Sequence, residues 1–394
     1  MRQDRRSGFG IYVHIPFCRS KCPYCDFVSY AGREERIPAY CEALNREMEA
    51  AARGLSGARA RTLYFGGGTP SLVEAGRIGA IIDACRTLFG LPMEAEVSLE
   101  ANPGTVDARR LAALRSAGVN RLSLGVQSFH DVRLRLLGRA HTAAESLAAF
   151  GAARQAGFAN VGLDLMYALP GQTPDEWLAD LRQAVELGPE HVSLYGLAVE
   201  EGTPLAGLVA AGEVSVPSAD EAAAMLEAAA AVLAGAGYSQ YELSNWARHD
   251  GSRLFDWRCQ HNLGYWRHEP YRGFGAGAHS YCGHRRLRNE PDLDRYVAMV
   301  AASGTAVVEV EEVDSLQAAH ETVMLGLRLA EGLDLGAFAA RHGLDLATRC
   351  ASTLAELREL GLLAQEGNRV WLLPKGRLLA NEVVVRLLLD LQAV

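Results

Sequence analysis

The hydrophobic and polar positions of residues 10 to about 200 alternate between short β-branched or aromatic runs and longer stretches rich in alanine and leucine. The short runs predict strands, and the longer stretches predict helices because their apolar residues recur at helical spacing. Strands are expected at 10–15, 60–68, 94–102, 119–127, 160–171 and 190–199. Helices are expected between them at 39–53, 73–89, 107–118, 143–157 and 174–188. Six such units predict an α/β fold with a parallel sheet, in the form of an open, partial (β/α)6 barrel.

The pattern changes after residue 215. A helix is expected at 218–237, and the segment 246–284 holds three of the five tryptophans and five of the eleven histidines. Beyond about 306, helices and two short strands around the turn at 366–368 predict a C-terminal helical, winged-helix-like domain. We therefore expect a barrel at 1–245, a segment packed on it at 246–305 and the C-terminal domain at 306–394.

Composition excludes several classes of protein. The chain has 394 residues with 49% hydrophobic positions, and its formal charge of −8 argues against a nucleic-acid surface. The C-terminal domain lacks a basic recognition face and is expected to be structural or to dock a partner. Eight cysteines, three of them in one cluster, indicate a reducing compartment, by default the cytoplasm. The first residues hold no apolar run typical of a signal peptide, and no segment suggests a membrane span.

Three cysteines in one short loop carry the main chemical signal. Cys18, Cys22 and Cys25 have the spacing C-x3-C-x2-C and follow the first predicted strand. An iron–sulfur cube with three thiolate ligands leaves its fourth iron open to a small molecule. Zinc with a distant fourth ligand, or a redox thiol pair, stays an alternative. The glycines at 66–68 end the next strand, where they allow backbone groups to approach a polar ligand or form a plain tight turn.

Polar residues gather where predicted strands end. Glu100, Gln127 and Asp164 each close an apolar run and precede a loop. The reaction face of a parallel α/β barrel lies at the carboxyl ends of its strands, so these side chains are candidates for a ligand site. Each of them alone would also fit an ordinary polar loop position.

These stretches together resemble the radical S-adenosylmethionine (radical SAM) superfamily, in its coproporphyrinogen-dehydrogenase-like branch. The matching segments are YVHIPFCRSKCPYCDF, LYFGGGTPS, SLEANPG, NRLSLGVQSF, LGRAH and LDLMYALPGQT. The resemblance implies a [4Fe-4S] cluster on Cys18, Cys22 and Cys25, with S-adenosyl-L-methionine (SAM) on the open iron. It also implies SAM or cluster contacts for a set of other residues: Tyr12, Tyr24, Gly67, Gly68, Thr69, Glu100, Gln127, Arg139 and Asp164.

Two departures separate the chain from the decarboxylases of this branch. Those enzymes carry a further cysteine two positions after the third, where this chain has Phe27, and a longer segment before the loop than the 17 residues present here. HNLGYW at 261–266 instead matches the HNxxYW motif of the HemW-type haem chaperones. The resemblance implies haem binding by His261, Asn262, Tyr265 and Trp266, with His261 as first choice of axial ligand.

Other assignments stay open at this stage. His261 and Asn262 would, without the resemblance, fit a structural hydrogen-bonding element, and His279 and Cys282 are alternative iron ligands. Three arginines at 285, 286 and 288 would meet haem propionates or form a solvated face. The isolated cysteines at 41, 85, 259 and 350 fit buried apolar positions.

Two functions of different class follow. The first is a chaperone that delivers haem to apo-haem proteins of the respiratory chain, with transient membrane contact during delivery. The second is a radical enzyme, such as an oxygen-independent coproporphyrinogen III dehydrogenase, that acts on a tetrapyrrole. The sequence favours the first, without turnover of porphyrinogen, and it leaves a homodimer open.

Overall fold

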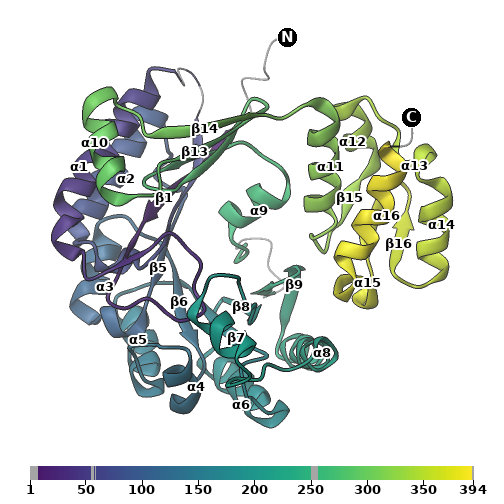
Figure 1. Ribbon diagram of the computed structural model, residues 1–394, viewed down its shortest axis with the longest axis horizontal. Helices are drawn as coiled ribbons and strands as arrows, with labels where there is room; N and C mark the ends of the chain where they lie inside the picture. Colours follow the sequence, from purple (N-terminus) through teal and green to yellow (C-terminus); the bar gives the residue numbers. More distant parts are fainter. Residues whose placement is uncertain (1–7, 55–56, 58, 250–255, 393–394) are drawn as a thin grey trace.

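The computed structural model describes residues 8–54, 57, 59–249 and 256–392. Within them, the central element is a curved sheet with the strand order β14-β13-β12-β11-β1-β4-β5-β6-β7-β8-β10-β9 (Figure 1). Its six barrel strands are β1 (Phe9–Ile15), β4 (Ala60–Gly67), β5 (Glu96–Ala101), β6 (Arg121–Gln127), β7 (Asn160–Tyr167) and β8 (His191–Gly196). Each pairs in parallel with the next, so the partial (β/α)6 barrel predicted from the sequence is confirmed.

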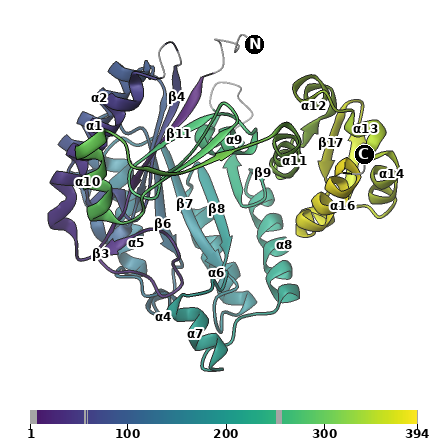
Figure 2. The ribbon, with the colours of Figure 1, turned by 45° about the horizontal axis from the view of Figure 1, so that its top comes forward.

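Helices cover the outer side of this sheet (Figures 1 and 2). They are α1 (Ile37–Ala52), α2 (Ala75–Phe89), α3 (Ala108–Ser116), α4 (Asp131–Leu136), α5 (Ala143–Gln155), α6 (Pro174–Leu187) and α8 (Ala219–Gly235). The short helix α7 (Pro204–Ala210) lies at the mouth of the barrel, where the Leu205 N–H donates to Pro23 O of the cysteine loop at 2.9 Å. The helix ends follow local sequence signals. Thr142 and Thr173 each form a capping box, and Gly90 and Gly188 end α2 and α6 in the left-handed conformation. Strand and helix side chains meet in one continuous apolar core.

Segments from the second half of the chain complete both edges of the sheet. β11 (Tyr271–Phe274) pairs in parallel with β1, and β12 (His279–Cys282), β13 (Arg285–Asn289) and β14 (Val307–Glu312) follow antiparallel. At the other edge, β10 (Asn245–Arg248) pairs antiparallel with β8, and β9 (Tyr238–Glu242) pairs antiparallel with β10. The segment after residue 245 therefore contributes strands to both edges of the sheet, and β14 lies beyond the expected boundary at 305.

The C-terminal unit has its own core. Its helices are α11 (Ser315–Gly326), α12 (Leu335–His342), α13 (Leu346–Arg349), α14 (Ala351–Glu359), α15 (Pro374–Leu378) and α16 (Ala380–Gln392). Three short strands, β15 (Leu333–Asp334), β17 (Arg369–Leu372) and β16 (Leu363–Glu366), pair antiparallel. The predicted succession of helix, strand, turn and strand is present, and β15 adds a third strand through long-range pairing.

Helix α9 (Gln260–Trp266) joins the two parts. It lies on the inner side of the curved sheet, where it contacts β1 and β4, and it also contacts α11 of the C-terminal unit (Figure 1). A further helix, α10 (Leu293–Ser303), packs against α1 on the outer side. Among the described residues, no helix is both long and apolar enough to span a bilayer.

Candidate functional site

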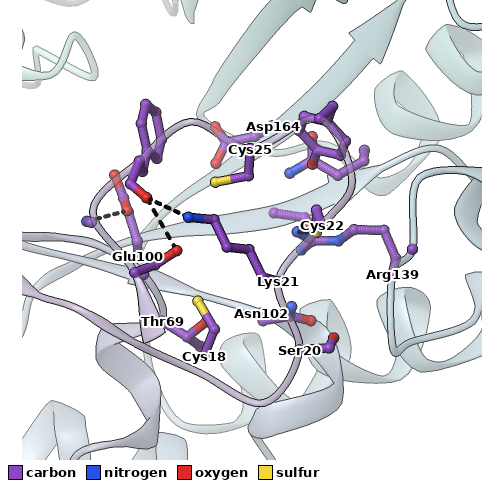
Figure 3. A pocket seen from close by; sticks show the side chains of 18 of the residues that line it. Cys18, Ser20, Lys21, Cys22, Cys25, Thr69, Glu100, Asn102, Arg139 and Asp164 are labelled. Atoms are coloured by element: carbon purple, nitrogen blue, oxygen red, sulfur yellow. Dashed lines mark hydrogen bonds between the residues drawn. The ribbon is translucent and has the colours of Figure 1, made fainter. Parts of the chain in front are cut away.

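The cysteine loop runs between two short paired strands, β2 (Phe17–Cys18) and β3 (Tyr30–Ala31). Their pairing closes the loop at its base, at the carboxyl end of β1. The side chains of Cys18, Cys22 and Cys25 all line a cavity of about 440 Å³ at the mouth of the barrel (Figure 3). The structure thus brings the three thiols to the face where the sequence placed the chemistry.

Two of the thiols have hydrogen-bond donors beside them. The Thr69 hydroxyl lies 3.6 Å from Cys18 Sγ, and the Arg139 guanidinium lies 3.7 Å from Cys22 Sγ. Among the described residues, no three His, Cys, Asp or Glu side chains are arranged to hold a single metal ion. A cube does not need such convergence, because its thiolates bind different irons. Three thiolates are one ligand short of a structural zinc site and match a cube with one open iron, so the donor set fits an iron–sulfur cluster.

The glycine-rich end of β4 is shaped by close contact with this loop. Gly67 has φ +111°, and a Cβ there would lie 2.4 Å from the His14 ring. A Cβ on Gly68 would lie 2.7 Å from the carbonyl oxygen of Phe17, next to the first cysteine. The Gly68 N–H donates to Ile15 O and the Thr69 N–H to Phe17 O, each at 2.8 Å. Glycine is required because the two backbones pack directly together.

Two carboxyl groups lie deeper in the cavity. Glu100 accepts from the Tyr64 hydroxyl at 2.8 Å and from the Gly67 N–H at 3.2 Å, and burial raises its pKa to about 7. Asp164 accepts from the Ser123 hydroxyl at 3.0 Å, and burial also raises its pKa. Both keep acceptor oxygens beside a concave site, as recognition of hydroxyl or ammonium groups requires.

The remaining predicted residues come from β6, the segment between α4 and α5, the cysteine loop and β1. Gln127 ends β6 with φ +67°, and Arg139 donates to Gly125 O at 3.0 Å. Tyr24 lines the cavity from the cysteine loop. Tyr12 lies one layer deeper, where its hydroxyl is 2.9 Å from His14 Nδ1, and His14 Nε2 is 2.8 Å from Val28 O of the cysteine loop. Eight of the nine residues that the resemblance implied therefore line the cavity together with the thiols. The ninth, Tyr12, is linked to the cysteine loop through His14.

A second cavity of about 230 Å³ lies within the barrel and is closed partly by α9. His261 of the HNLGYW motif is buried there. Its Nδ1 is 2.8 Å from Thr62 Oγ1, its Nε2 is 2.9 Å from the Tyr265 hydroxyl, and its ring stacks on Tyr64. Burial, and then the charge of Arg121, lower the His261 pKa to about 3. In this conformation both imidazole nitrogens are occupied, so His261 acts as a hydrogen-bonding element of the barrel interior.

The other residues of the HNLGYW motif lie in two environments. Asn262 Nδ2 donates to the Tyr241 hydroxyl at 3.4 Å, and Asn262 and Tyr265 line the inner cavity. The Trp266 ring packs in a small apolar cluster under the Arg328 guanidinium. Three of the four motif residues thus line the barrel interior, whereas Trp266 packs in the cluster beside Arg328.

The alternative ligands and basic residues have different environments. His279 is exposed, and its imidazole makes no hydrogen bond among the described residues, whereas the Cys282 thiol donates to Tyr271 O at 3.2 Å. The three arginines of β13 pair with Glu312, Glu311 and Glu309 of β14, which favours the solvated face. The isolated cysteines are buried, as expected: Cys41, Cys85, Cys259 and Cys350.

Sequence reasoning missed the polar residues inside the strands. Tyr64, Ser123 and Arg121 lie in predicted strands, yet their side chains line the barrel interior. Their signal is polar or small residues at every second position of an otherwise apolar run, as in β6 with Arg121, Ser123, Gly125 and Gln127. Side chains alternate between strand faces, so this period marks a polar barrel lumen.

Comparison with known proteins agrees with this geometry. Residues 12–184 match the radical SAM superfamily, and residues 313–379 match the HemN C-terminal domain. "Heme chaperone HemW" of Mycobacterium tuberculosis is 39% identical over 96% of this chain and 95% of its own length. The Bacillus subtilis protein of the same name is 36% identical over 94% of this chain and 97% of its own length.

The fold is also that of a solved structure. Coproporphyrinogen III oxidase (HemN) from Escherichia coli, described as a radical SAM enzyme, superposes with a TM-score of 0.83 over 97% of this chain and 90% of its own, at 25% identity. The similarity to the HemW proteins is higher in identity and spans both structural units. The chain therefore belongs to the radical SAM superfamily and, within it, to the HemW family of haem chaperones.

Proposed function

We propose that this protein binds haem and delivers it to apo-haem proteins of the respiratory chain, using a barrel that holds a [4Fe-4S] cluster and SAM. The observation that carries the proposal is the similarity to haem chaperones over nearly the whole chain, including the α9 segment. Phe27 supports it, because it takes the position of a further cysteine in the decarboxylases and is 61% exposed at the rim of the cavity.

Cys18, Cys22 and Cys25 would hold the cluster. Support comes from the shared cavity and from the donors Thr69 and Arg139, since hydrogen bonds to sulfur are among the features that set a cluster's potential. When bound, the cluster and SAM together supply one-electron chemistry. The glycine strand end, Tyr24, Gln127 and the carboxyls of Glu100 and Asp164 would hold and orient SAM.

The haem ligand is a separate question. His261 remains the prediction from the motif, and its ligation of iron requires α9 to release the imidazole from Thr62 and Tyr265. His279 needs no such movement. It lies two residues after Gly277, whose Cα packs against Val28 of the cysteine loop, so haem there would lie near the proposed cluster.

Haem titration of the anaerobically purified protein, followed in the Soret band, tests the binding. We expect saturable binding by the wild type, and a changed spectrum in either His261→Ala or His279→Ala identifies the ligand. His249→Ala serves as a histidine control. Transfer is then measured from the loaded protein to a respiratory apo-haem protein, with apomyoglobin as a passive acceptor. Absence of saturable binding in the wild type would refute the proposal.

A radical enzyme acting on a tetrapyrrole is the second candidate. It is favoured by the likeness to the HemN enzyme and by the presence of every cavity residue assigned to SAM. Incubation of reconstituted, reduced protein with SAM and coproporphyrinogen III separates the two. The chaperone proposal predicts that coproporphyrinogen III is not consumed, and measurable decarboxylation would contradict it.

A further inference from the structure

The inner cavity contains polar groups to which the proposed function gives no role. It adjoins the cysteine cavity, since Tyr64, Glu100, Ser123 and Tyr195 line both. Three buried polar atoms on residues of its wall have no hydrogen-bond partner: Arg121 Nε, His191 Nδ1 and Asn245 Oδ1. These residues are only 2%, 2% and 7% exposed. Buried polar atoms are normally paired, so three orphans around one cavity indicate a missing partner.

Arg121 is the charged member of this set. Among the described residues it makes neither an ion pair nor a side-chain hydrogen bond. Its neighbouring carboxylates are engaged elsewhere. Glu96 accepts from the N–H groups of Gln260 and His261 at 3.0 and 3.1 Å, and Glu100 accepts from Tyr64 and Gly67. A buried guanidinium without a contacting anion is costly, and a bound anion would offset that cost.

His191 supplies a second donor at the same place. His191 Nε2 lies 2.9 Å from the Tyr241 hydroxyl, which also accepts from Asn262. In the tautomer in which Tyr241 donates to Nε2, the imidazole proton is on Nδ1, the nitrogen without a partner. Burial, and then Arg121, keep the His191 pKa well below its ordinary value, so the ring is neutral. A Cβ on Gly162 would lie 3.3 Å from His191 Nδ1 and 3.6 Å from an Arg121 nitrogen. Both nitrogens therefore lie beside Gly162, which has no side chain to separate them.

We propose that the inner cavity binds a carboxylate group, with Arg121 as its charge partner and His191 Nδ1–H as its second donor. An Arg with a neighbouring neutral donor matches the two oxygens of a carboxylate. The unpaired Asn245 Oδ1 would accept from a donor elsewhere on the ligand or from a water beside it. Two sources offer this chemistry: a propionate of haem, which rests on the proposed function, and a free small carboxylate, which does not.

Thermal unfolding of the full chain tests the site. The wild type is measured in sodium propionate and in propionamide, a neutral analogue, at matched ionic strength. We expect propionate alone to raise the Tm, because a ligand that binds the folded state stabilises it. Arg121→Met should lose that rise, while Arg182→Met, an exposed arginine control, should keep it. A wild-type Tm that responds equally to both compounds would overturn the proposal and leave a water-filled cavity.

Haem and its dimethyl ester separate the two sources. If a propionate occupies the site, the wild type should bind haem at least about tenfold more tightly than the ester, because a charge-assisted pair is lost in the ester. Arg121→Met should remove the preference. A propionate-dependent Tm without any preference for haem would identify a free carboxylate as the ligand. A wild type that binds neither porphyrin would refute the proposed function, while the propionate comparison still decides the site.

Discussion

Glu100 is a carboxyl group whose protonation is coupled to folding. Burial raises its pKa from 4.5 to about 7, so between these values the folded protein holds a proton that the unfolded chain has released. The stability this group contributes is therefore complete below pH 4.5 and is lost as the pH rises through 7.

Glu100→Gln should remove this dependence in SAM-free protein. As the pH rises from 4.5 to 8, the free energy of unfolding of the variant should increase relative to that of the wild type by up to about 3 kcal/mol. Denaturant unfolding at a series of pH values measures the difference. Glu201→Gln, at an exposed position, is the control. A difference that stays constant over this range would show that Glu100 has an ordinary pKa.

Thr69 gives a second prediction at the scale of one residue. Thr69→Val keeps the side-chain shape but removes the donor 3.6 Å from Cys18 Sγ. A hydrogen bond to sulfur stabilises the reduced cluster, so its loss should lower the midpoint potential by about 40 mV, equivalent to about 1 kcal/mol. Redox titration followed by electron paramagnetic resonance measures the shift. Unchanged potential at equal iron content would contradict the role given to the hydroxyl.

The end of β4 packs directly against the base of the cysteine loop, so a change in one displaces the other. Gly68→Ala would place a Cβ 2.7 Å from Phe17 O and 3.0 Å from Ile15 O, and backbone atoms cannot move aside as a flexible side chain would. We expect a folded protein that loses most of its iron, because the loop base shifts. Gly151→Ala in α5, where a Cβ meets nothing within 4 Å, should keep its iron and gain about 0.5–1 kcal/mol. Equal iron in both variants would refute this reading.

The elements differ in how well the sequence predicted them. The six barrel strands and their helices follow from local patterns, such as the capping boxes at Thr142 and Thr173. β11 could not be assigned to a position beside β1, because its pairing joins residues about 260 apart and depends on the whole sheet. The cysteine cavity was predictable from spacing and resemblance. The polar lumen had a signal in the alternation of β6, but the unpaired atoms around Arg121 could not be predicted, because hydrogen-bond partners are known only from the structure.

At the scale of the whole molecule, the barrel and the C-terminal unit meet across β13 and α11. Arg286 pairs with Glu321 at 2.7 Å, and Glu321 is only 14% exposed. Burial lowers the pKa of the adjacent His268 to about 3, so that imidazole is neutral and Arg286 is the cation of this contact. The contact is thus a partly buried charge pair between the two units.

Glu321→Gln should weaken this junction. We expect a loss of about 1–3 kcal/mol in the free energy of unfolding, because the Arg286 charge is left with a weaker partner. Glu312→Gln removes an exposed pair with Arg285 and should cost no more than about 1 kcal/mol. Urea unfolding compares the two variants, and equal losses would contradict the special role of Glu321.

The account as a whole depends on three thiols that hold a cluster with an open iron. Iron and acid-labile sulfide per chain, measured after anaerobic reconstitution, test it most directly. We predict about four irons in the wild type and in Cys282→Ser, and a large loss in Cys22→Ser. Zinc in place of iron, or equal iron in Cys22→Ser and wild type, would contradict the account.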